Sequence, residues 1–518
     1  MYIGSRRECF FDDFLIDKEK TTAKFLLHSP QIKEQVMRYD MPWEGDGCGS
    51  QCIIKDGDIY RMYYIGRKMK YENTADDPGY FHCYAESSDG INWIRPELGI
   101  FEFEGSRKNN ILGCRRKGEF LHGPMSVFLD TNPECPYDKR IKALVCHDKN
   151  DGNGPSLWAL CSGDGIHFDY KCPIFIEKGG HYDSMMGCFW DETVKKYRLY
   201  IRGYHLPEEY CGPAADSHDK LSYGIRVRDI MYLESEDFIN WSSSAQIRYS
   251  DGDYNLQMYE NKITAYYRAP HIQIGFPTRY IERKEWTPNY DELTDREKRL
   301  ARFKREDRFG LAITDCTFMA SRNGFEFSRF SEAFMRPGRE NGRNWIYGDV
   351  AYPALGMIET DAAYPDIGKE ISMYFPRNEW HDEPTELWRY TLRLDGFVSL
   401  HAGGEEVETI VTNPFVFEGD DLFINFETSA KGFLYIALTA DDGTVIKSCE
   451  TFGDSLDRRV RFERGTPIDL RGKEVTMKIE LLDADIYSFR FGSNKKRLQT
   501  CVHPFAVVFL LAFGEGLW

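Results

Sequence analysis

The sequence predicts an all-β protein, a five-bladed β-propeller followed by a C-terminal β-sandwich. Three observations favour this fold. A short pattern with an Asp-Gly-like turn occurs five times, its copies are 75, 73, 86 and 72 residues apart, and almost no helix signal lies between them. A unit that recurs at near-constant spacing indicates a repeat architecture. The five copies read YAESSDGINW (84–93), LCSGDGIHF (160–168), YLESEDFINW (232–241), MASRNGFEF (319–327) and YTLRLDGFVSL (390–400).

Each copy is expected to form a hairpin of two neighbouring strands. An Asp-Gly or Asn-Gly pair between extended segments favours a tight turn, because such a turn requires positive φ values. Gly90, Gly165, Gly324 and Gly396 occupy the turn position in four copies, and Phe238 occupies it in the third. The copies therefore mark the outer half of five similar units.

Two more extended segments precede each hairpin, so each unit contains four antiparallel strands, the arrangement of a propeller blade. The second strands alternate aromatic and polar residues, as expected for strands between stacked sheets. The inner strands are expected at 49–57, 124–132, 184–193, 254–262 and 350–359, and the second strands at 59–67, 140–147, 196–203, 262–269 and 370–377.

Two insertions interrupt this pattern. Residues 284–308 carry charged residues at helical spacing, and Thr294 is the expected N-cap of the helix. This segment falls between the second and third strands of the fourth unit, which explains the spacing of 86 residues. Residues 205–222 are expected to be a loop of the third unit, and both insertions would border one rim of the propeller.

The blade pattern ends near residue 404. Short alternating strands with Asp-Gly and Lys-Gly turns follow, which is typical of a β-sandwich. The final segment contains a short apolar run that is well below the ~20 residues of a membrane-spanning helix. The expected domains are a propeller over 1–404, a β-sandwich over 405–492 and an apolar tail of open role over 493–518.

Composition restricts the class of partner. The net charge of −17 argues against nucleic acid or an anionic membrane as partner. The N-terminus lacks the apolar run of a secretory signal, so we expect a cytoplasmic location with the 14 cysteines as free thiols. Dinucleotide, P-loop, zinc-protease and GxSxG motifs are absent, so no cofactor and no metal are expected. The aromatic content of 15% suits a carbohydrate partner, and the oligomeric state is left open.

The residues that open the inner strands are the main candidates for chemistry, because in a propeller these positions surround one mouth of the axial channel. Crowded carboxylates cannot all ionise freely, which separates their pKa values. One protonated and one ionised carboxyl group are what glycoside hydrolysis requires. An aspartate is also common in ordinary turns, where its side chain binds backbone amides. The opening residues are Asp46, His122, Asp183, Asp253 and Asp349.

Other residues near these positions are candidates for binding a sugar. Trp43 and Trp345 would stack on an apolar sugar face or pack within a blade, and Glu44 supplies a second carboxylate beside Asp46. Charged and imidazole side chains that would bind hydroxyls, a carboxylate or a phosphate follow the second strands. They are Arg67, Arg202, His205, Arg268, His271, His381 and Glu383.

The chain resembles the five-bladed propeller glycosidase superfamily, which contains the invertase/levanase and arabinanase/β-xylosidase families. It is most similar to uncharacterised bacterial proteins classed as glycosyl hydrolases of this type. FFDDFLID (10–17), PWEGDG (42–47), YAESSDGINW (84–93), the segment around Asp183 and RLDGFVSL (393–400) carry the resemblance.

The resemblance implies roles for three positions. The opening residue of the first inner strand is the nucleophile or base in that superfamily, which assigns the role to Asp46 or its neighbour Glu44. The second blade tunes this group or holds the sugar, and the third supplies the general acid. Those positions hold His122 and Asp183, where the superfamily has Asp and Glu. Asp349 would complete the set.

The favoured function is therefore hydrolysis of a glycosidic bond of an oligo- or polysaccharide. Three alternatives remain open at this point. The propeller would bind carbohydrate without catalysis, or it would use the carboxylates and His122 as hard ligands of a metal. A lyase acting on uronic sugars would instead use arginines such as Arg67, Arg202 and Arg268.

Overall fold

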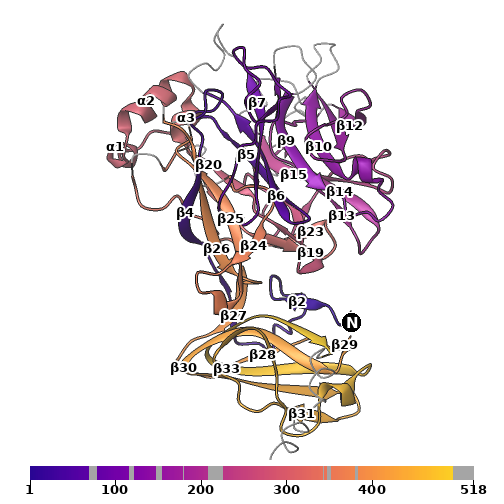
Figure 1. The fold of residues 1–518 in the computed structure, drawn as a ribbon. Helices are drawn as coiled ribbons and strands as arrows, with labels where there is room; N and C mark the ends of the chain where they lie inside the picture. The colour runs from indigo at the N-terminus through magenta and orange to yellow at the C-terminus, as the bar shows by residue number, and fades with distance from the viewer. Residues whose placement is uncertain are drawn as a thin grey trace, which may run out of the picture. The chain divides into compact units, whose positions relative to one another are not determined.

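The computed structural model describes residues 1–68, 79–115, 122–147, 155–178, 180–207, 226–341, 344–346, 352–379 and 383–493 (Figure 1). The chain divides into two compact units. One unit comprises Leu27–Phe397, and the other comprises Met1–Leu26 together with the chain from Val398 onward. The expected tail over 493–518 lies outside the described residues, apart from Ser493.

The unit Leu27–Phe397 is a five-bladed β-propeller, which confirms the fold predicted from the repeats. Three blades are four-stranded sheets whose strands follow chain order from the axis outward. Blade 1 contains β5 (Gly49–Asp56), β6 (Ile59–Gly66), β7 (Tyr80–Ser87) and β8 (Ile111–Arg115). Blade 2 contains β9 (His122–Leu129), β10 (Ile141–His147), β11 (Ser156–Ser162) and β12 (Ile174–Lys178). Blade 3 contains β13 (Gly187–Asp191), β14 (Lys196–His205), β15 (Val227–Ser235) and β16 (Ala245–Gln246).

Blade 4 differs from the prediction by one strand. Its inner strand is β18 (Thr264–Tyr266), which the sequence analysis assigned to the second strand, and its second strand is β19 (Ala269–Gly275). The segment 254–262, predicted as the inner strand, forms no named strand. Two outer strands, β22 (Met319–Ser321) and β23 (Glu326–Arg329), continue the sheet, and β17 (Arg248–Tyr249) adds a fifth strand in parallel with β23.

Blade 5 is closed by a strand from the N-terminal part of the chain. It contains β24 (Ile358–Asp361), β25 (Lys369–Arg377), β26 (Glu386–Arg393) and, outermost, β4 (Gln31–Arg38). Figure 1 shows the indigo strand β4 beside the orange strand β26. The fifth copy of the repeat does not supply the fourth strand of this blade, because β27 (Val398–Ala402) belongs to the other unit. The two ends of the propeller chain thus share one blade.

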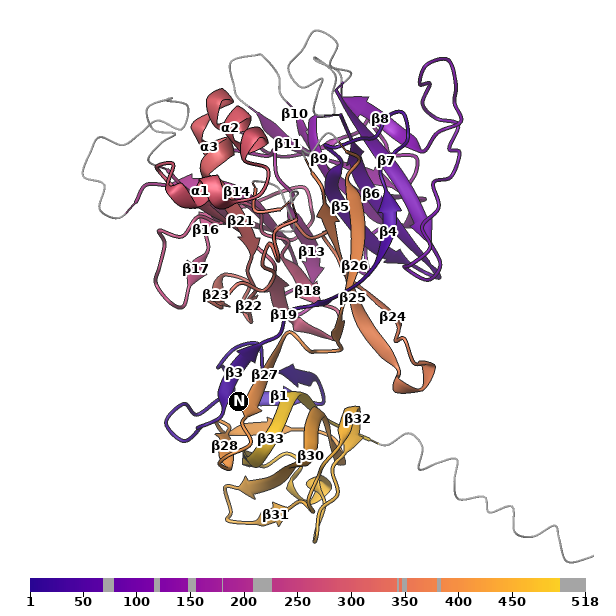
Figure 2. The same cartoon turned by 90° about the vertical axis from the view of Figure 1, so that its left-hand side faces the viewer.

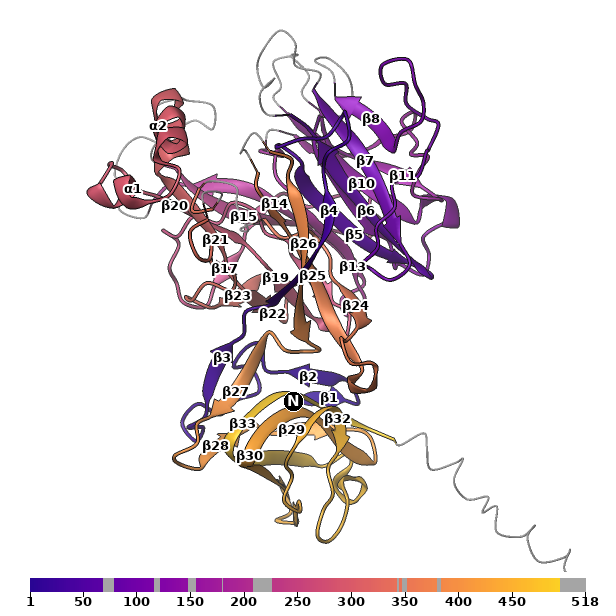
Figure 3. The same cartoon turned by 60° about the vertical axis from the view of Figure 1, so that its left-hand side comes forward.

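The insertion in blade 4 lies between its second and third strands, as predicted. It begins and ends with the hairpin strands β20 (Thr278–Glu282) and β21 (Ala312–Cys316). Instead of one helix over 284–308, it contains α1 (Pro288–Glu292), α2 (Arg296–Arg305) and α3 (Asp307–Leu311). Figure 3 shows α1 and α2 at the periphery. The N-cap of α2 is Asp295 in a left-handed conformation, not Thr294.

The turns of the repeat join neighbouring blades. Gly90, Gly165 and Gly324 have φ values of 74°, 76° and 74°. The carbonyl oxygen of each turn glycine accepts a hydrogen bond from a tyrosine on the second strand of the preceding blade, and glycine leaves room for that tyrosine. The donors are Tyr374 to Gly90 (2.5 Å), Tyr63 to Gly165 (3.0 Å) and Tyr200 to Gly324 (2.7 Å).

The third and fifth copies have other contacts in place of this hydrogen bond from a tyrosine to a turn glycine. In the third copy Phe238, with a φ of 65°, fills the space itself, and Leu144 stands where the other second strands have tyrosine. In the fifth copy the positive φ falls on Asp395 rather than on Gly396, and Tyr266 of blade 4 donates a hydrogen bond to the Asp395 carboxylate. The expected positive φ at Gly396 is therefore wrong.

The second unit is one ten-stranded sheet built around two long strands, β30 (Asp421–Ala440) and β33 (Glu474–Gly492) (Figure 2). Inward residues from both halves of these strands share one hydrophobic core, so the sheet folds over itself as a sandwich. The other strands are β1 (Tyr2–Gly4), β2 (Arg7–Cys9), β3 (Lys24–Leu27), β27, β28 (Glu408–Val411), β29 (Phe415–Phe417), β31 (Val445–Lys447) and β32 (Asp454–Arg459).

This unit does not follow the expected boundaries of 1–404 and 405–492. The N-terminal strands β1 and β2 pair with β29 and β33, so the sandwich is discontinuous in sequence. Ile3, Phe10 and Leu15 are buried in its core, and this burial explains why the first 26 residues belong here.

Candidate active site

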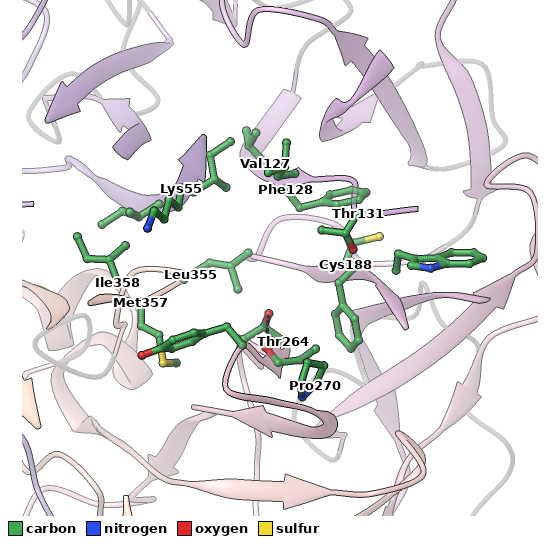
Figure 4. Close-up of a pocket in the computed structure, with 18 of the residues that line it drawn as sticks. Lys55, Val127, Phe128, Thr131, Cys188, Thr264, Pro270, Leu355, Met357 and Ile358 are labelled. Carbon is green, nitrogen blue, oxygen red and sulfur yellow. Dashed lines mark hydrogen bonds between the residues drawn. The ribbon is translucent and has the colours of Figure 1, made fainter. Parts of the chain in front are cut away.

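The inner strands leave two ends of the propeller axis that differ in chemistry. At the end where these strands finish, a cavity of about 550 Å³ is lined mainly by apolar side chains (Figure 4). Ile53, Val127, Phe189, Ile263 and Leu355 are among its lining residues. Glycosidic chemistry requires converging carboxyl groups, so the opposite end, where the inner strands begin, is the better candidate for an active site.

Contacts between neighbouring inner strands hold this mouth together. The backbone N–H of Val127 in blade 2 donates to the sulfur of Cys52 in blade 1 (3.3 Å). The N–H of Met186 in blade 3 donates to Ser126 Oγ of blade 2 (2.9 Å). Blades 5 and 1 are joined through Leu355, whose backbone pairs with β5 in parallel. A mouth built on these strands is a rigid support for catalytic side chains.

Asp46 lies three residues before β5. Asp46 is only 8% exposed, and it lines a cavity of about 340 Å³. Tyr39, Pro42, Lys68 and Pro384 are among the other residues that line this cavity. A nearly buried carboxylate at the edge of a cavity is suited to act on a ligand held there.

Glu44 lines the same cavity, but its carboxylate is engaged in hydrogen bonds with neighbouring residues. Its carboxylate accepts hydrogen bonds from Arg95 Nε and Nη2 (both 3.0 Å), Tyr64 Oη (2.5 Å) and the backbone N–H of Met41 (3.1 Å). Burial raises the pKa of Glu44, and the positive charge of Arg95 and these hydrogen bonds oppose that rise. With both oxygens occupied, Glu44 is a supporting residue rather than a nucleophile.

Asp183 precedes β13 and forms an ion pair with Arg202 of β14. Its side chain is 65% exposed, whereas Arg202 is buried. The guanidinium of Arg202 also lies over the rings of Tyr204 (5.4 Å) and Tyr259 (5.0 Å). The carboxylate of Asp183 is thus held by a buried arginine while the rest of its side chain is open to solvent.

Glu260 is a further carboxylate at the mouth, and it is not among the opening residues predicted from the sequence. It comes before inner strand β18, is 6% exposed, and accepts a hydrogen bond from the backbone N–H of Met185 in blade 3 (3.2 Å). Its other oxygen lies 2.5 Å from Nζ of the buried Lys262. Because the predicted inner strand of blade 4 was one strand too early, Asp253 was taken for the opening residue instead.

Asp253 is wrong as a member of the ring. Its side chain is 54% exposed and accepts a hydrogen bond from the backbone N–H of Asn255, as in an ordinary turn. Arg268 was misplaced for the same reason, because it lies in the turn after β18, where it pairs with Asp395 (2.7 Å). The alternating isoleucines of β19 (APHIQIG) are the local pattern that indicates a strand at this place.

The two tryptophans are engaged in packing. Trp43 donates its indole N–H to Asn110 (2.9 Å) and packs edge-on against Phe103 within blade 1. Trp345 donates to the carbonyl of Gly338 (2.7 Å) and packs against the apolar cluster of the helical insertion. Asp349, His381 and the side chain of His122 lie outside the described residues.

Several buried polar atoms have no hydrogen-bond partner within the described residues. Those at the mouth include Oε1 of Gln51, near the start of β5, and Oγ of Ser184, which follows Asp183. The other end of the Gln51 side chain donates to Tyr39 Oη (3.0 Å), a residue of the Asp46 cavity. Buried polar groups are normally satisfied, so these atoms are suited to meet the hydroxyls of a bound ligand.

Comparisons of the sequence with protein families and with curated proteins find no match. Solved structures with a similar chain trace do exist. One is an N-acetylgalactosamine deacetylase from F. plautii in complex with blood group B trisaccharide, with 11% identity and a TM-score of 0.45, covering 71% of this chain and 95% of that one. Another is the Bombyx mori GH32 β-fructofuranosidase, with 10% identity and a TM-score of 0.41, covering 89% and 96%.

A third similar structure belongs to the GH130 family of mannoside phosphorylases, which contains glycoside hydrolases that target β-1,2 mannosidic linkages in Candida mannan. It has 11% identity and a TM-score of 0.40, covering 71% of this chain and 96% of that one. Likeness at this level says nothing about the reaction, because function depends on the side chains of a site rather than on its fold. None of the helices in the described ranges is long and apolar enough to cross a membrane.

Proposed function

We propose that this protein is a glycosidase that hydrolyses a glycosidic bond of an oligo- or polysaccharide at the mouth of the propeller axis. The observation that carries the proposal is the nearly buried carboxylate of Asp46, which lies three residues before the innermost strand of blade 1 and lines a cavity of about 340 Å³. The unsatisfied side-chain oxygens of Gln51 and Ser184 support it as partners for sugar hydroxyls.

Asp46 is the base or nucleophile in this proposal, and Glu44 holds its loop in place. The hydrogen bonds of Glu44 to Arg95, Tyr64 and Met41 fix the segment that precedes β5. A supporting shell of this kind keeps a catalytic group within a few tenths of an ångström of its productive position.

Two residues compete for the role of the second carboxyl group. Asp183 has the position that the resemblance implies, but its carboxylate pairs with Arg202. Glu260 is buried and faces Lys262, so it would be available only if the substrate displaced that ion pair. General acid catalysis typically contributes about 10²–10⁴-fold to the rate, so the two assignments are distinguishable by kinetics.

The test is a screen of aryl glycosides and glycan libraries, followed by Asp46→Asn, Asp183→Asn and Glu260→Gln on the best substrate. We expect Asp46→Asn to abolish turnover with an unchanged melting temperature. Of the other two, the variant that loses about 10²-fold or more identifies the acid. Asp253→Asn, an exposed carboxylate of the same fold, is the control. Full activity in Asp46→Asn would contradict the proposal.

A second candidate function is a propeller that binds carbohydrate without cleaving it. The observation that favours it is that Glu44 and Asp183 are both paired with arginine, as expected of structural carboxylates. Binding of a glycan by the wild-type protein, without turnover of that glycan at any pH between 4 and 9, would select this candidate.

A further inference from the structure

A second cavity, of about 310 Å³, lies in blade 3 beside Asp183 and gathers positively charged and imidazole side chains. Glu177 is the one carboxylate among its described lining residues, and that carboxylate accepts a hydrogen bond from Tyr182 (3.0 Å). We refer to this cavity as the blade 3 pocket. Its basic and imidazole lining residues are Lys178, His181, Arg202, His205 and Arg226.

The two arginines of the blade 3 pocket are held in place by aromatic rings. Arg202 is 4% exposed and Arg226 is 8% exposed. Both guanidinium groups lie over the ring of Tyr204, at 5.4 Å and 5.8 Å, and that ring also packs against His181 (4.6 Å). An arginine that is fixed in this way presents a planar set of donors that matches a carboxylate, sulfate or phosphate group.

The blade 3 pocket adjoins Asp183, one of the two candidates for the second carboxyl group, through Arg202. The backbones of His181 and Arg202 form a β-bridge, and Asp183 pairs with the guanidinium of Arg202. Because the Asp183 side chain is 65% exposed, it contacts Arg202 from the solvent side. The side chain of Arg202 is itself only 3% exposed, so an anionic group of a ligand would reach this guanidinium by taking the place of the exposed Asp183 carboxylate.

The charge of the whole chain makes a local cluster of this kind significant. The protein has a net charge of −17, so its overall field opposes the approach of an anion. Two of the five basic or imidazole side chains of the pocket face a carboxylate, Arg202 facing Asp183 and His205 facing Asp229 (3.1 Å). Lys178 and Arg226 supply positive charge beyond these two pairs, which favours an anionic ligand over a neutral one.

We infer that the blade 3 pocket binds an oxyanion carried by the sugar, so that the substrate is an acidic carbohydrate with a uronic acid carboxylate or a sulfate ester. This inference rests on the proposed function for the identity of the ligand as a carbohydrate. Arg202 and Arg226 bind the anionic group, and the sugar ring extends from there toward Asp183 and the mouth of the axis.

The test is binding to the full-length protein by isothermal titration calorimetry. The probes are D-glucuronate, D-galacturonate and glucose 6-sulfate, with neutral D-glucose and D-galactose and with inorganic phosphate for comparison. We expect at least one anionic sugar to bind about tenfold or more tightly than its neutral counterpart, the range of one charge-assisted hydrogen bond. A comparison of the two uronates with glucose 6-sulfate then shows whether the pocket prefers a carboxylate or a sulfate ester.

Arg226→Met should remove this preference, and Arg283→Met is the matched control, because Arg283 is exposed and lies outside the pocket. If Arg226→Met does not fold, the salt dependence of binding by the wild-type protein tests the inference instead. The affinity for the anionic sugar should fall between 50 and 500 mM NaCl, and that for a neutral sugar should not, since salt screens charges.

Equal affinity for anionic and neutral sugars would overturn the inference, as would binding of inorganic phosphate alone, because the anion would then not belong to the sugar. Binding of a uronate in a protein whose Asp46→Asn variant retains full turnover would support the pocket and overturn the proposed catalytic role of Asp46. The two failures are therefore distinguishable.

Discussion

At the scale of single residues, the carboxylates of this protein differ in pKa because their surroundings differ. Asp237 accepts hydrogen bonds from the backbone N–H groups of Asn240 and Ile239, which lower its pKa to about 2. In Asp89, burial would raise the pKa, but the bonds from Asn92 and Ile91 prevail and lower it to about 2. Glu44 shows the opposite balance, since burial raises its pKa.

The turn carboxylates predict a loss of stability in acid. A lowered pKa in the folded state means that Asp89 and Asp237 contribute stability above the unfolded value of about 4, and that this contribution disappears as the pH falls toward 2. Asn323 shows that asparagine fits the same turn. The double variant Asp89→Asn/Asp237→Asn should therefore melt with a weaker pH dependence between pH 5 and pH 2.

The measurement is the melting temperature against pH by circular dichroism. Asp253→Asn serves as the control, because Asp253 is an exposed carboxylate of an ordinary turn. An identical slope for wild type and double variant would contradict the assignment.

The buried pair of Glu44 and Arg95 predicts a large effect of a single substitution. Glu44→Ala removes the buried carboxylate that accepts hydrogen bonds from Arg95 and Tyr64, although Arg95 keeps the carbonyl of Arg38 as an acceptor. This removal should cost about 3–5 kcal/mol of unfolding free energy. Glu102→Ala removes an exposed pair with Arg107 at 3.8 Å and should cost less than about 1 kcal/mol. Urea unfolding of both variants measures the difference, and equal costs would show that the Glu44 network is not structural.

At the scale of elements, the turn of one blade fits the second strand of the blade before it. Tyr63, Tyr200 and Tyr374 each donate a hydrogen bond to a turn glycine of the following blade. A Cβ atom on Gly165 would come within 2.6 Å of Tyr63 Oη, so glycine is required there for space as well as for its positive φ. The Asp-Gly signal read as a hairpin marker is thus also a contact between blades.

A comparison of two glycines separates these requirements. Gly165 and Gly105 both have a positive φ, 76° and 80°, but a Cβ on Gly105 would meet nothing within 4 Å. Gly105→Ala should cost about 1 kcal/mol for backbone strain, and Gly165→Ala should cost about 1–3 kcal/mol more for overpacking. Chemical denaturation gives both values, and a Gly165→Ala variant as stable as Gly105→Ala would mean that the inter-blade contact contributes nothing.

At the scale of the whole molecule, both units are assembled from segments that are far apart in sequence. Strand β4 completes blade 5 beside β26, and β1 and β2 complete the sandwich sheet. Closing the ring in this way leaves only short, protected sheet edges, whereas exposed edges favour aggregation.

Substitution of Phe10 tests whether residues 1–26 belong to the sandwich. Its ring is 1% exposed and lies 5.7 Å from Phe489 of β33, so Phe10→Ala should destabilise this unit by about 3–5 kcal/mol. Phe14, four residues later, is 45% exposed, and Phe14→Ala should change stability by less than about 0.5 kcal/mol. Calorimetry resolves the effect, and a Phe10→Ala variant that melts like wild type would contradict the assignment of 1–26 to the sandwich.

The repeats made most of the propeller predictable. The first three strands of blades 1, 2 and 3 were located, because each has five residues or more and ends at a clear turn. The fourth strands β8, β12 and β16 begin later than expected, after the ends of the repeated segments. Blade 4 was displaced by one strand, because its inner strand β18 has only three residues and follows a positive φ at Lys262. Because the inner strand of blade 4 was predicted one strand too early, Asp253 was predicted as its opening residue and Glu260 was not. The prediction of a ring of opening residues requires the correct inner strand in every blade.

By itself the sequence determined the number of blades, the turns that end them and the location of Asp46, because these depend on local patterns of apolar residues, glycine and aspartate. Only the tertiary structure decided that Glu44 pairs with Arg95, that Asp183 pairs with Arg202, that Glu260 reaches the mouth and that residues 1–26 complete the sandwich. Each of these results depends on contacts between segments distant in sequence, and local pattern carries no information about which distant groups meet.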